Sequence, residues 1–226
     1  LNCTAPITRE PDLVSPEFIE FLLWFPAIVV ALSLHEFAHA AVADALGDPT
    51  PRALGRVTLN PLSHLDVVGT VLLVLVHFGW GRPVPVDPRF LRHPRRDLVL
   101  IAAAGPAINV ATAIVVGLAL RILAPTLLAS TLGTFVFLSL QALVLLSLLL
   151  AFFNLIPLPP LDGSKVLGGL LPEPLGSRYR NAGWLGWGLL VIILFGSFTG
   201  TYLITGLIYP PSRWLYGLLV GLPLGN

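Results

Sequence analysis

Residues 21–43 read FLLWFPAIVVALSLHEFAHAAVA, a stretch whose only ionisable side chains are His35, Glu36 and His39. A helix rises about 1.5 Å per residue, so a stretch of this length can cross a hydrocarbon core about 30 Å thick. Ionisable groups inside such a helix are costly and by default functional. The stretch therefore predicts a membrane-spanning helix that carries part of a functional site.

Further uncharged segments indicate a polytopic membrane protein. The chain is 55% hydrophobic and only 11% charged, against about 25% charged residues in soluble domains. Leu98–Leu120, Leu132–Ile156 and Gly183–Tyr209 are each long enough to span. Val67–Phe78 is short and is expected to be re-entrant or tilted, and Trp214–Leu224 is expected to lie along a surface as a short interfacial helix. We predict an all-α protein with about four spanning helices.

The arginines predict the orientation in the membrane. Seven of them lie between Gly47 and Asp97, and they stay together on one side only if Val67–Phe78 does not cross. Cytoplasmic loops carry an excess of arginine and lysine. We therefore expect this region on the cytoplasmic side, with the N-terminus outside.

The overall charge and the spacing of the segments bear on partners and domains. Thirteen basic and twelve acidic residues leave a net charge of +1, which gives no reason to expect a nucleic-acid partner. No hydrophilic insertion of domain size separates the hydrophobic segments. We expect one membrane-embedded domain over 1–226, with a catalytic core of about 21–170 and a C-terminal part, 183–226. The lipid bilayer is an expected partner, and the oligomeric state is left open.

The pair His35 and His39 has the spacing of metal ligands. Side chains four residues apart lie on one face of a helix, so both imidazoles can reach one ion. Glu36 is adjacent, where a carboxylate can take a proton from a water on the metal. Two buried, hydrogen-bonded histidines beside a coincidental glutamate are the structural alternative. The position inside a spanning helix favours the metal.

A catalytic zinc site needs a third protein ligand, and Asp162 is the candidate. It ends the sequence NLIPLPPLD after the segment Leu132–Ile156. The prolines break the helix and free backbone groups, which membrane depth tolerates only against protein or water. The arginine-based topology brings this segment end and the two histidines to the same side. The alternative is a turn aspartate before Gly163.

Several motifs together resemble the site-2 protease family of intramembrane zinc metalloproteases. They are His35–His39, Gly55–His64, Gly105–Asn109 and Asn154–Gly163, in the order of the family. Gly81–Val86 is similar to the compact prokaryotic branch that lacks an inserted PDZ domain. The resemblance implies a multi-pass protein of the prokaryotic cell membrane, with its active site toward the cytoplasm.

The family pattern also implies roles for individual residues. It implies one Zn²⁺ per chain held by His35, His39 and Asp162, with Glu36 as the general base. Asn154 would hold the substrate backbone or the developing oxyanion, because an amide both donates and accepts hydrogen bonds.

Two further residues have competing interpretations. Asn109 matches a recurrent family asparagine near the site and is a second candidate for contact with substrate or oxyanion. Its neighbours Gly105 and Pro106 could simply form a kink for helix packing. His64 could support the site or gate it, or it could be an interfacial histidine with a solvated ring.

The resulting functional prediction is a zinc endopeptidase that cuts a transmembrane protein substrate within or near its membrane-spanning helix. The substrate would unwind locally and pair by strand addition with an edge in the loop between the first two long spans. The alternatives are a metal or ion transporter that uses the same histidines and aspartate, a catalytically silent membrane adaptor, and a zinc protease that cuts soluble loops.

Overall fold

The computed structural model describes residues 15–76, 79–180, 182–186, 188, 191 and 203–221. This part of the chain is helical and contains no β-strand. The elements are α1 (Pro16–Ala45), α2 (Thr50–Ala53), η1 (Pro61–Ser63), α3 (Val67–Val76), η2 (Pro88–Phe90), α4 (Pro94–Leu127), α5 (Thr131–Asn154), α6 (Asp162–Leu170), α7 (Leu175–Arg180) and α9 (Leu203–Val220).

Three of these helices are long and apolar enough to cross a membrane: Phe18–Ala45 within α1, Pro94–Leu127 and Thr131–Asn154. They confirm three of the spans predicted from the sequence. The protein is therefore a membrane protein of helical architecture. The fourth predicted span, Gly183–Tyr209, lies largely outside the described residues.

Serine side chains begin two of the long helices. Ser15 accepts a hydrogen bond from the backbone N–H of Phe18 at 3.3 Å, and Ser130 accepts one from Gly133 at 3.1 Å. At these positions a hydroxyl satisfies an N–H that has no partner within the helix. The starts of α1 and α5 are thus fixed by local sequence.

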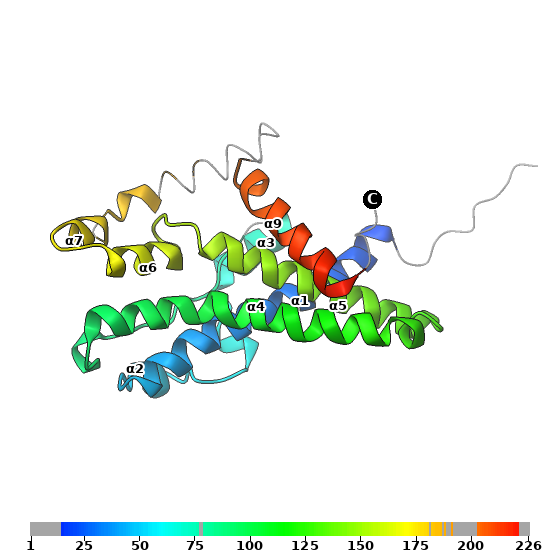
Figure 1. The fold of residues 1–226 in the computed structure, drawn as a ribbon. Coiled ribbons are helices and arrows are strands. Elements are labelled where there is room, and N and C mark those ends of the chain that lie inside the picture. Colours follow the sequence, from blue (N-terminus) through cyan, green and yellow to red (C-terminus); the bar gives the residue numbers. More distant parts are fainter. Residues whose placement is uncertain are drawn as a thin grey trace, which may run out of the picture.

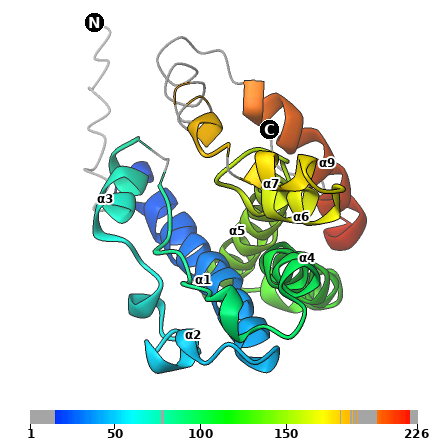
Figure 2. The same cartoon turned by 90° about the vertical axis from the view of Figure 1, so that its left-hand side faces the viewer.

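Helices α1, α4 and α5 all contact one another and form the centre of the molecule (Figures 1 and 2). In Figure 1, α4 and α5 run side by side, and α6 and α7 lie at the end where α4 begins and α5 ends. Helix α6 also contacts α4. This arrangement carries the start of α6, a connection of only seven residues beyond α5, back over the three-helix centre.

The region between α1 and α4 is folded around polar anchors. The buried side chain of Asp48 accepts hydrogen bonds from the N–H groups of Thr50 and Asp87, at 2.9 and 2.7 Å. Within this region the predicted short hydrophobic element is α3, which at 10 residues is about 15 Å long and too short to span. Asp66 caps it by accepting from the N–H of Gly69 at 2.8 Å.

The C-terminal segment differs from the prediction in one respect. Residues 214–220 are not a separate short helix but the last turns of α9, which continues through Pro210 and Pro211. Tyr216 and Val220 are buried against α4 and α5 rather than lying free along a surface. The helix continues although a proline lacks the N–H that a helix interior uses. The boundaries of the domain, 21–170 and 183–226, remain a prediction.

Candidate metal centre

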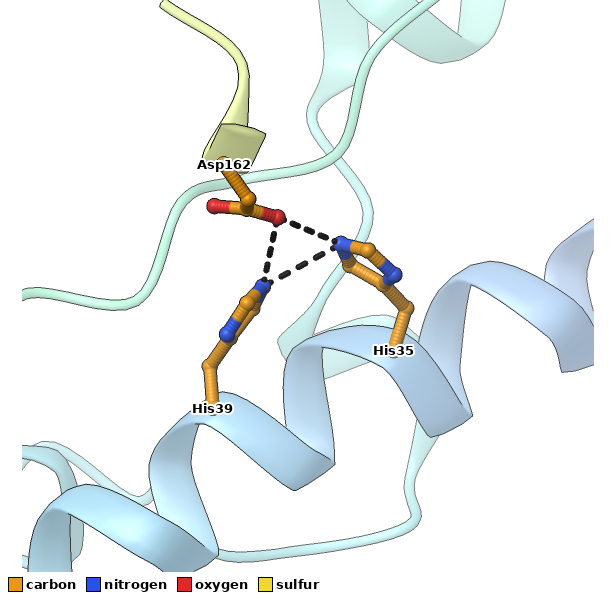
Figure 3. A group of neighbouring side chains, drawn as sticks. All are labelled: His35, His39 and Asp162. Atoms are coloured by element: carbon orange, nitrogen blue, oxygen red, sulfur yellow. Dashed lines mark hydrogen bonds and ion pairs between the residues drawn. The ribbon is translucent and has the colours of Figure 1, made fainter. Parts of the chain in front are cut away.

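Helix α1 places His35 and His39 one turn apart on the same face (Figure 3). Their Nε2 atoms are 3.1 Å apart, and the two residues are only 3% and 8% exposed. The rings meet edge to face, with centroids 4.7 Å apart. The four-residue spacing in the sequence therefore produces a buried pair of imidazole nitrogens that point at one place.

Asp162 completes the group from a distant part of the chain. It is the first residue of α6 and follows the proline-rich connection from α5. Its Oδ2 atom lies 3.1 Å from Nε2 of His35 and 3.0 Å from Nε2 of His39. The three side chains form the triangle of ligand atoms seen in Figure 3, and all three are buried. The predicted convergence of these residues is thus present in the structure.

The charge state of Asp162 suits a ligand. Burial alone would raise the pKa of its carboxyl group, but hydrogen bonds to His35 and His39 and the charge of Lys165 hold that pKa well below its usual value. Nζ of Lys165, one helical turn further along α6, is 3.0 Å from Oδ1. Lys165 thus engages one carboxylate oxygen and leaves the other facing the histidines.

The donor set fits a zinc ion. Zinc in catalytic sites takes nitrogen and oxygen ligands at about 2.0–2.2 Å, and a tetrahedral arrangement puts such ligands about 3.3 Å apart. The edges of the observed triangle measure 3.0–3.1 Å. Three protein ligands also match the number in catalytic zinc sites, which keep a fourth position open for water or substrate.

One face of α4 closes over this triangle. Nδ1 of His39 donates a hydrogen bond to the backbone carbonyl of Ile101 at 2.7 Å. Four residues further on, a Cβ atom on Gly105 would lie 2.5 Å from Nε2 of His39 and 2.6 Å from Cε1 of His35. Four residues further still, Nδ2 of Asn109 is 3.3 Å from Nδ1 of His35. Only a residue without a side chain fits at position 105, between Ile101 and Asn109. The sequence alone is compatible with either a site residue or a kink for helix packing at this glycine.

Glu36 lies next to the histidines in sequence but outside the triangle of ligand atoms. Its side chain is half-buried, and it interacts electrostatically with His39, Asp162 and the positively charged Arg56. Arg56 is buried and donates hydrogen bonds to the backbone carbonyls of Arg82 and Pro83. The glutamate is thus close enough to interact electrostatically with both the triangle and Arg56.

Asn154 and His64 make other contacts among the described residues. Nδ2 of Asn154, at the end of α5, donates to the carbonyl of Leu150 in its own helix at 3.0 Å. His64 is fully buried, and its Nε2 donates to the carbonyl of Thr58 at 2.8 Å, while burial lowers the pKa of its imidazole. Its backbone carbonyl accepts from the N–H of Arg82 at 2.7 Å. His64 therefore anchors the loop between α1 and α4, and its ring is not solvated.

Sequence reasoning missed two contributors to the site. The carbonyl of Ile101 leaves no trace in side-chain chemistry, because any residue could supply it. Lys165 belongs to none of the motifs found in the sequence. Its position three residues after Asp162 is the available signal, since residues three apart are neighbours once the segment is helical, as it is in α6.

Comparison with known proteins assigns the chain to a family. Residues 122–195 match the sequence profile of peptidase family M50. YwhC of Bacillus subtilis (strain 168), which is named as a zinc metalloprotease, is 38% identical over 182 residues, covering 78% of this chain and 81% of YwhC.

Two mycobacterial relatives, both called Rip2 and also named as zinc metalloproteases, show a similar extent of likeness. The protein of Mycobacterium tuberculosis (strain ATCC 25618 / H37Rv) is 33% identical over 208 residues, covering 88% of this chain and 74% of its own length. That of Mycolicibacterium smegmatis is 30% identical over 209 residues, covering 88% and 72%. No solved structure matches the chain. The chain therefore belongs to peptidase family M50, the site-2 proteases.

Proposed function

We propose that this protein is an intramembrane zinc endopeptidase that binds one zinc ion per chain through His35, His39 and Asp162. The observation that carries the proposal is the buried triangle of two imidazole nitrogens and one carboxylate oxygen, with edges of 3.0–3.1 Å. It is supported by the position of both histidines on a helix of spanning length. A transporter would not need the glutamate that follows the first ligand.

A zinc ion at this place would polarise the scissile carbonyl and lower the pKa of a coordinated water toward about 7. Glu36 is the residue that takes the proton from that water and passes it to the leaving amine. Its location beside His35, partly buried and outside the ligand triangle, leaves its carboxylate free for this work.

Asn154 is the residue that holds the substrate by hydrogen bonds. It is the last residue of α5, eight residues before Asp162, so it lies at the start of the connection that leads to the third ligand. Its carboxamide can turn away from the carbonyl of Leu150 and donate to a substrate carbonyl or to the oxygen that gains charge in the transition state.

The substrate is a membrane protein whose helix opens near the site. A helical amide is already hydrogen-bonded, so a peptide bond must leave its helix before it can react. The region between α1 and α4 offers a place for the extended chain, because the β-type pairing in the described residues, Leu65 with Gly81, lies there. We place this region and the active site on the cytoplasmic side of a prokaryotic cell membrane.

The test uses the full chain in proteoliposomes with a model transmembrane peptide. We expect Glu36→Gln to keep bound zinc and to abolish cleavage, and Asp162→Asn to lose both. Glu20→Gln is the matched control, because Glu20 is an exposed carboxylate on the same helix. Mass spectrometry would locate the cut inside the span of the peptide. Substantial cleavage by Glu36→Gln, zinc flux without cleavage, or cuts confined to soluble loops would contradict the proposal.

A further inference from the structure

Asn109 presents an unusual combination of a close contact and an unused oxygen. The residue is 0% exposed, and its Nδ2 lies 3.3 Å from Nδ1 of His35. Its Oδ1 is buried and has no hydrogen-bond partner among the described residues. A buried polar atom without a partner is costly, so such an atom calls for an explanation.

His39 shows what the second ring nitrogen of a ligand histidine requires. Its Nδ1 faces the carbonyl oxygen of Ile101 at 2.7 Å, and a carbonyl can only accept. In the neutral ring that a metal ligand needs, the hydrogen is therefore on Nδ1, and Nε2 keeps its lone pair for an ion placed beside Asp162 and His35. The hydrogen bond from Nε2 to Asp162 belongs to the protonated ring without an ion. The backbone of α4 thus holds His39 in the tautomer that a metal ligand needs.

His35 has the same need and a different partner. If its Nε2 binds the metal, its Nδ1 must carry the hydrogen and donate it. With Nδ2 of Asn109 toward it, two donors would face each other at 3.3 Å. A half-turn of the carboxamide exchanges its nitrogen and oxygen, which occupy nearly the same positions. Oδ1 then accepts from Nδ1 of His35, so a hydrogen bond replaces the contact between two donors, and Nδ2 takes the buried position where no partner is found.

The geometry of α4 explains why these two acceptors meet the two histidines. Carbonyl groups in a helix point toward its C-terminus, while side chains tilt toward its N-terminus. The carbonyl of Ile101 and the side chain of Asn109, two turns apart, therefore converge at the level of Gly105. At this level the missing Cβ lets both rings approach the helix.

We propose that Asn109 is a positioning residue for the metal rather than a group that contacts substrate: its Oδ1 accepts the Nδ1–H of His35 and so fixes the tautomer and ring plane in which Nε2 binds zinc. The inference rests on the proposed function, because it takes His35 as a ligand. It assigns to one helix, α4, the support of both histidine ligands of α1.

The test measures zinc affinity by chelator competition on the full chain in detergent. Asn109→Leu removes the acceptor with similar volume and should weaken zinc binding about 10–100-fold, the usual cost of losing such a partner. Asn109→Asp keeps an acceptor and should bind zinc close to wild type. Ser147→Ala is the matched control, since Ser147 is also fully buried with an unpartnered oxygen, but on α5.

A spectroscopic readout separates positioning from packing. In ¹⁵N spectra of zinc-free, histidine-labelled protein at a pH where the rings are neutral, Asn109→Leu should convert one ring from the Nδ1–H tautomer to a mixture, and Asn109→Asp should not. Unchanged zinc affinity in Asn109→Leu, or equal weakening in both variants, would overturn the inference. If Asn109→Leu does not fold, failure of Asn109→Asp to hold zinc overturns it alone.

His35→Ala, measured alongside, distinguishes this inference from the proposed function. If His35→Ala keeps wild-type zinc affinity, the proposed ligand set is wrong. If His35→Ala loses zinc while Asn109→Leu keeps it, the ligand set stands and the role of Asn109 is wrong.

Discussion

The two halves of α4 differ in the contacts that they make and in what these contacts do. Its first half meets α1 at the buried histidines through a carbonyl, a glycine and an amide. Its second half packs against α5 and α9 in a buried cluster that includes Leu120 of α4 and Tyr216 of α9. Each half has a glycine at its closest approach, Gly105 against the imidazoles and Gly117 against Leu219. Close packing holds the protein together at one end of the helix and builds a site at the other.

The sharpest test of this contrast replaces each glycine by alanine. A Cβ at Gly105 would lie 2.5 Å from Nε2 of His39, so a ligand must move, and we expect a loss of zinc affinity of about 100-fold. A Cβ at Gly117 would lie 2.8 Å from Cβ of Leu219, far from any ligand. Gly117→Ala should lower thermal stability and leave zinc affinity unchanged. Equal zinc loss in both variants would remove the distinction.

Leu120→Ala approaches the contrast from the apolar side. Leu120 is 1% exposed, and its truncation leaves a cavity among α4, α5 and α9. Such a cavity costs about 2–5 kcal/mol, which lowers the unfolding midpoint of a chain of this size by roughly 4–20 °C. Fluorescence-monitored unfolding in detergent measures the shift. Zinc content should match wild type. Loss of zinc from Leu120→Ala protein that is still fully folded would show that the two halves of α4 are coupled.

Lys165→Gln should have a smaller effect on zinc binding. The effect should act through Asp162, the ligand that does not come from α1. The charge of Lys165 helps to keep the pKa of Asp162 low, so its removal raises that pKa. Protons then compete with zinc more strongly at this ligand, and the pH of half-release should rise slightly. A zinc-release titration with a fluorescent chelator measures it. A downward shift would mean that repulsion between Lys165 and the ion dominates.

Arg89→Ala, in the loop that leads into α4, should have the smallest effect. Arg89 lowers the pKa of Asp87 to about 2, below the value near 3.9 in an unfolded chain. A depressed carboxyl pKa stabilises the fold above the unfolded value and loses that effect as pH falls. Wild type should therefore melt slightly above Arg89→Ala at pH 7, with the difference vanishing between about pH 4 and 2. Zinc affinity should be the same.

Local patterns in the sequence predicted the spanning helices well. Uncharged length decides whether a helix can cross, so α1, α4 and α5 follow from composition alone. The histidine pair also follows from spacing on one helix, and Asp162 from topology joined to the family resemblance. The convergence of these three side chains is what the structure adds.

Tertiary contacts decided the parts that the sequence could not predict. The course of α9 through Pro210 and Pro211 depends on Tyr216 and Val220 finding partners on α4 and α5. From the sequence, His64 could support the site, gate it or be a solvated interfacial ring, and its burial beside Thr58 and Arg82 in the folded loop excludes the solvated ring. Gly105 matters because it has no side chain and so leaves room for the two imidazole rings of α1. This role becomes apparent only when α1 is packed against α4.

The most direct test of the account is an experimental structure of the zinc-loaded protein, with the metal located by anomalous scattering at the zinc edge. The account predicts one ion between α1 and the start of α6, bound by Nε2 of His35, Nε2 of His39 and a carboxylate oxygen of Asp162. An ion held by other residues, or one bound by the histidines with Asp162 turned away, would contradict it.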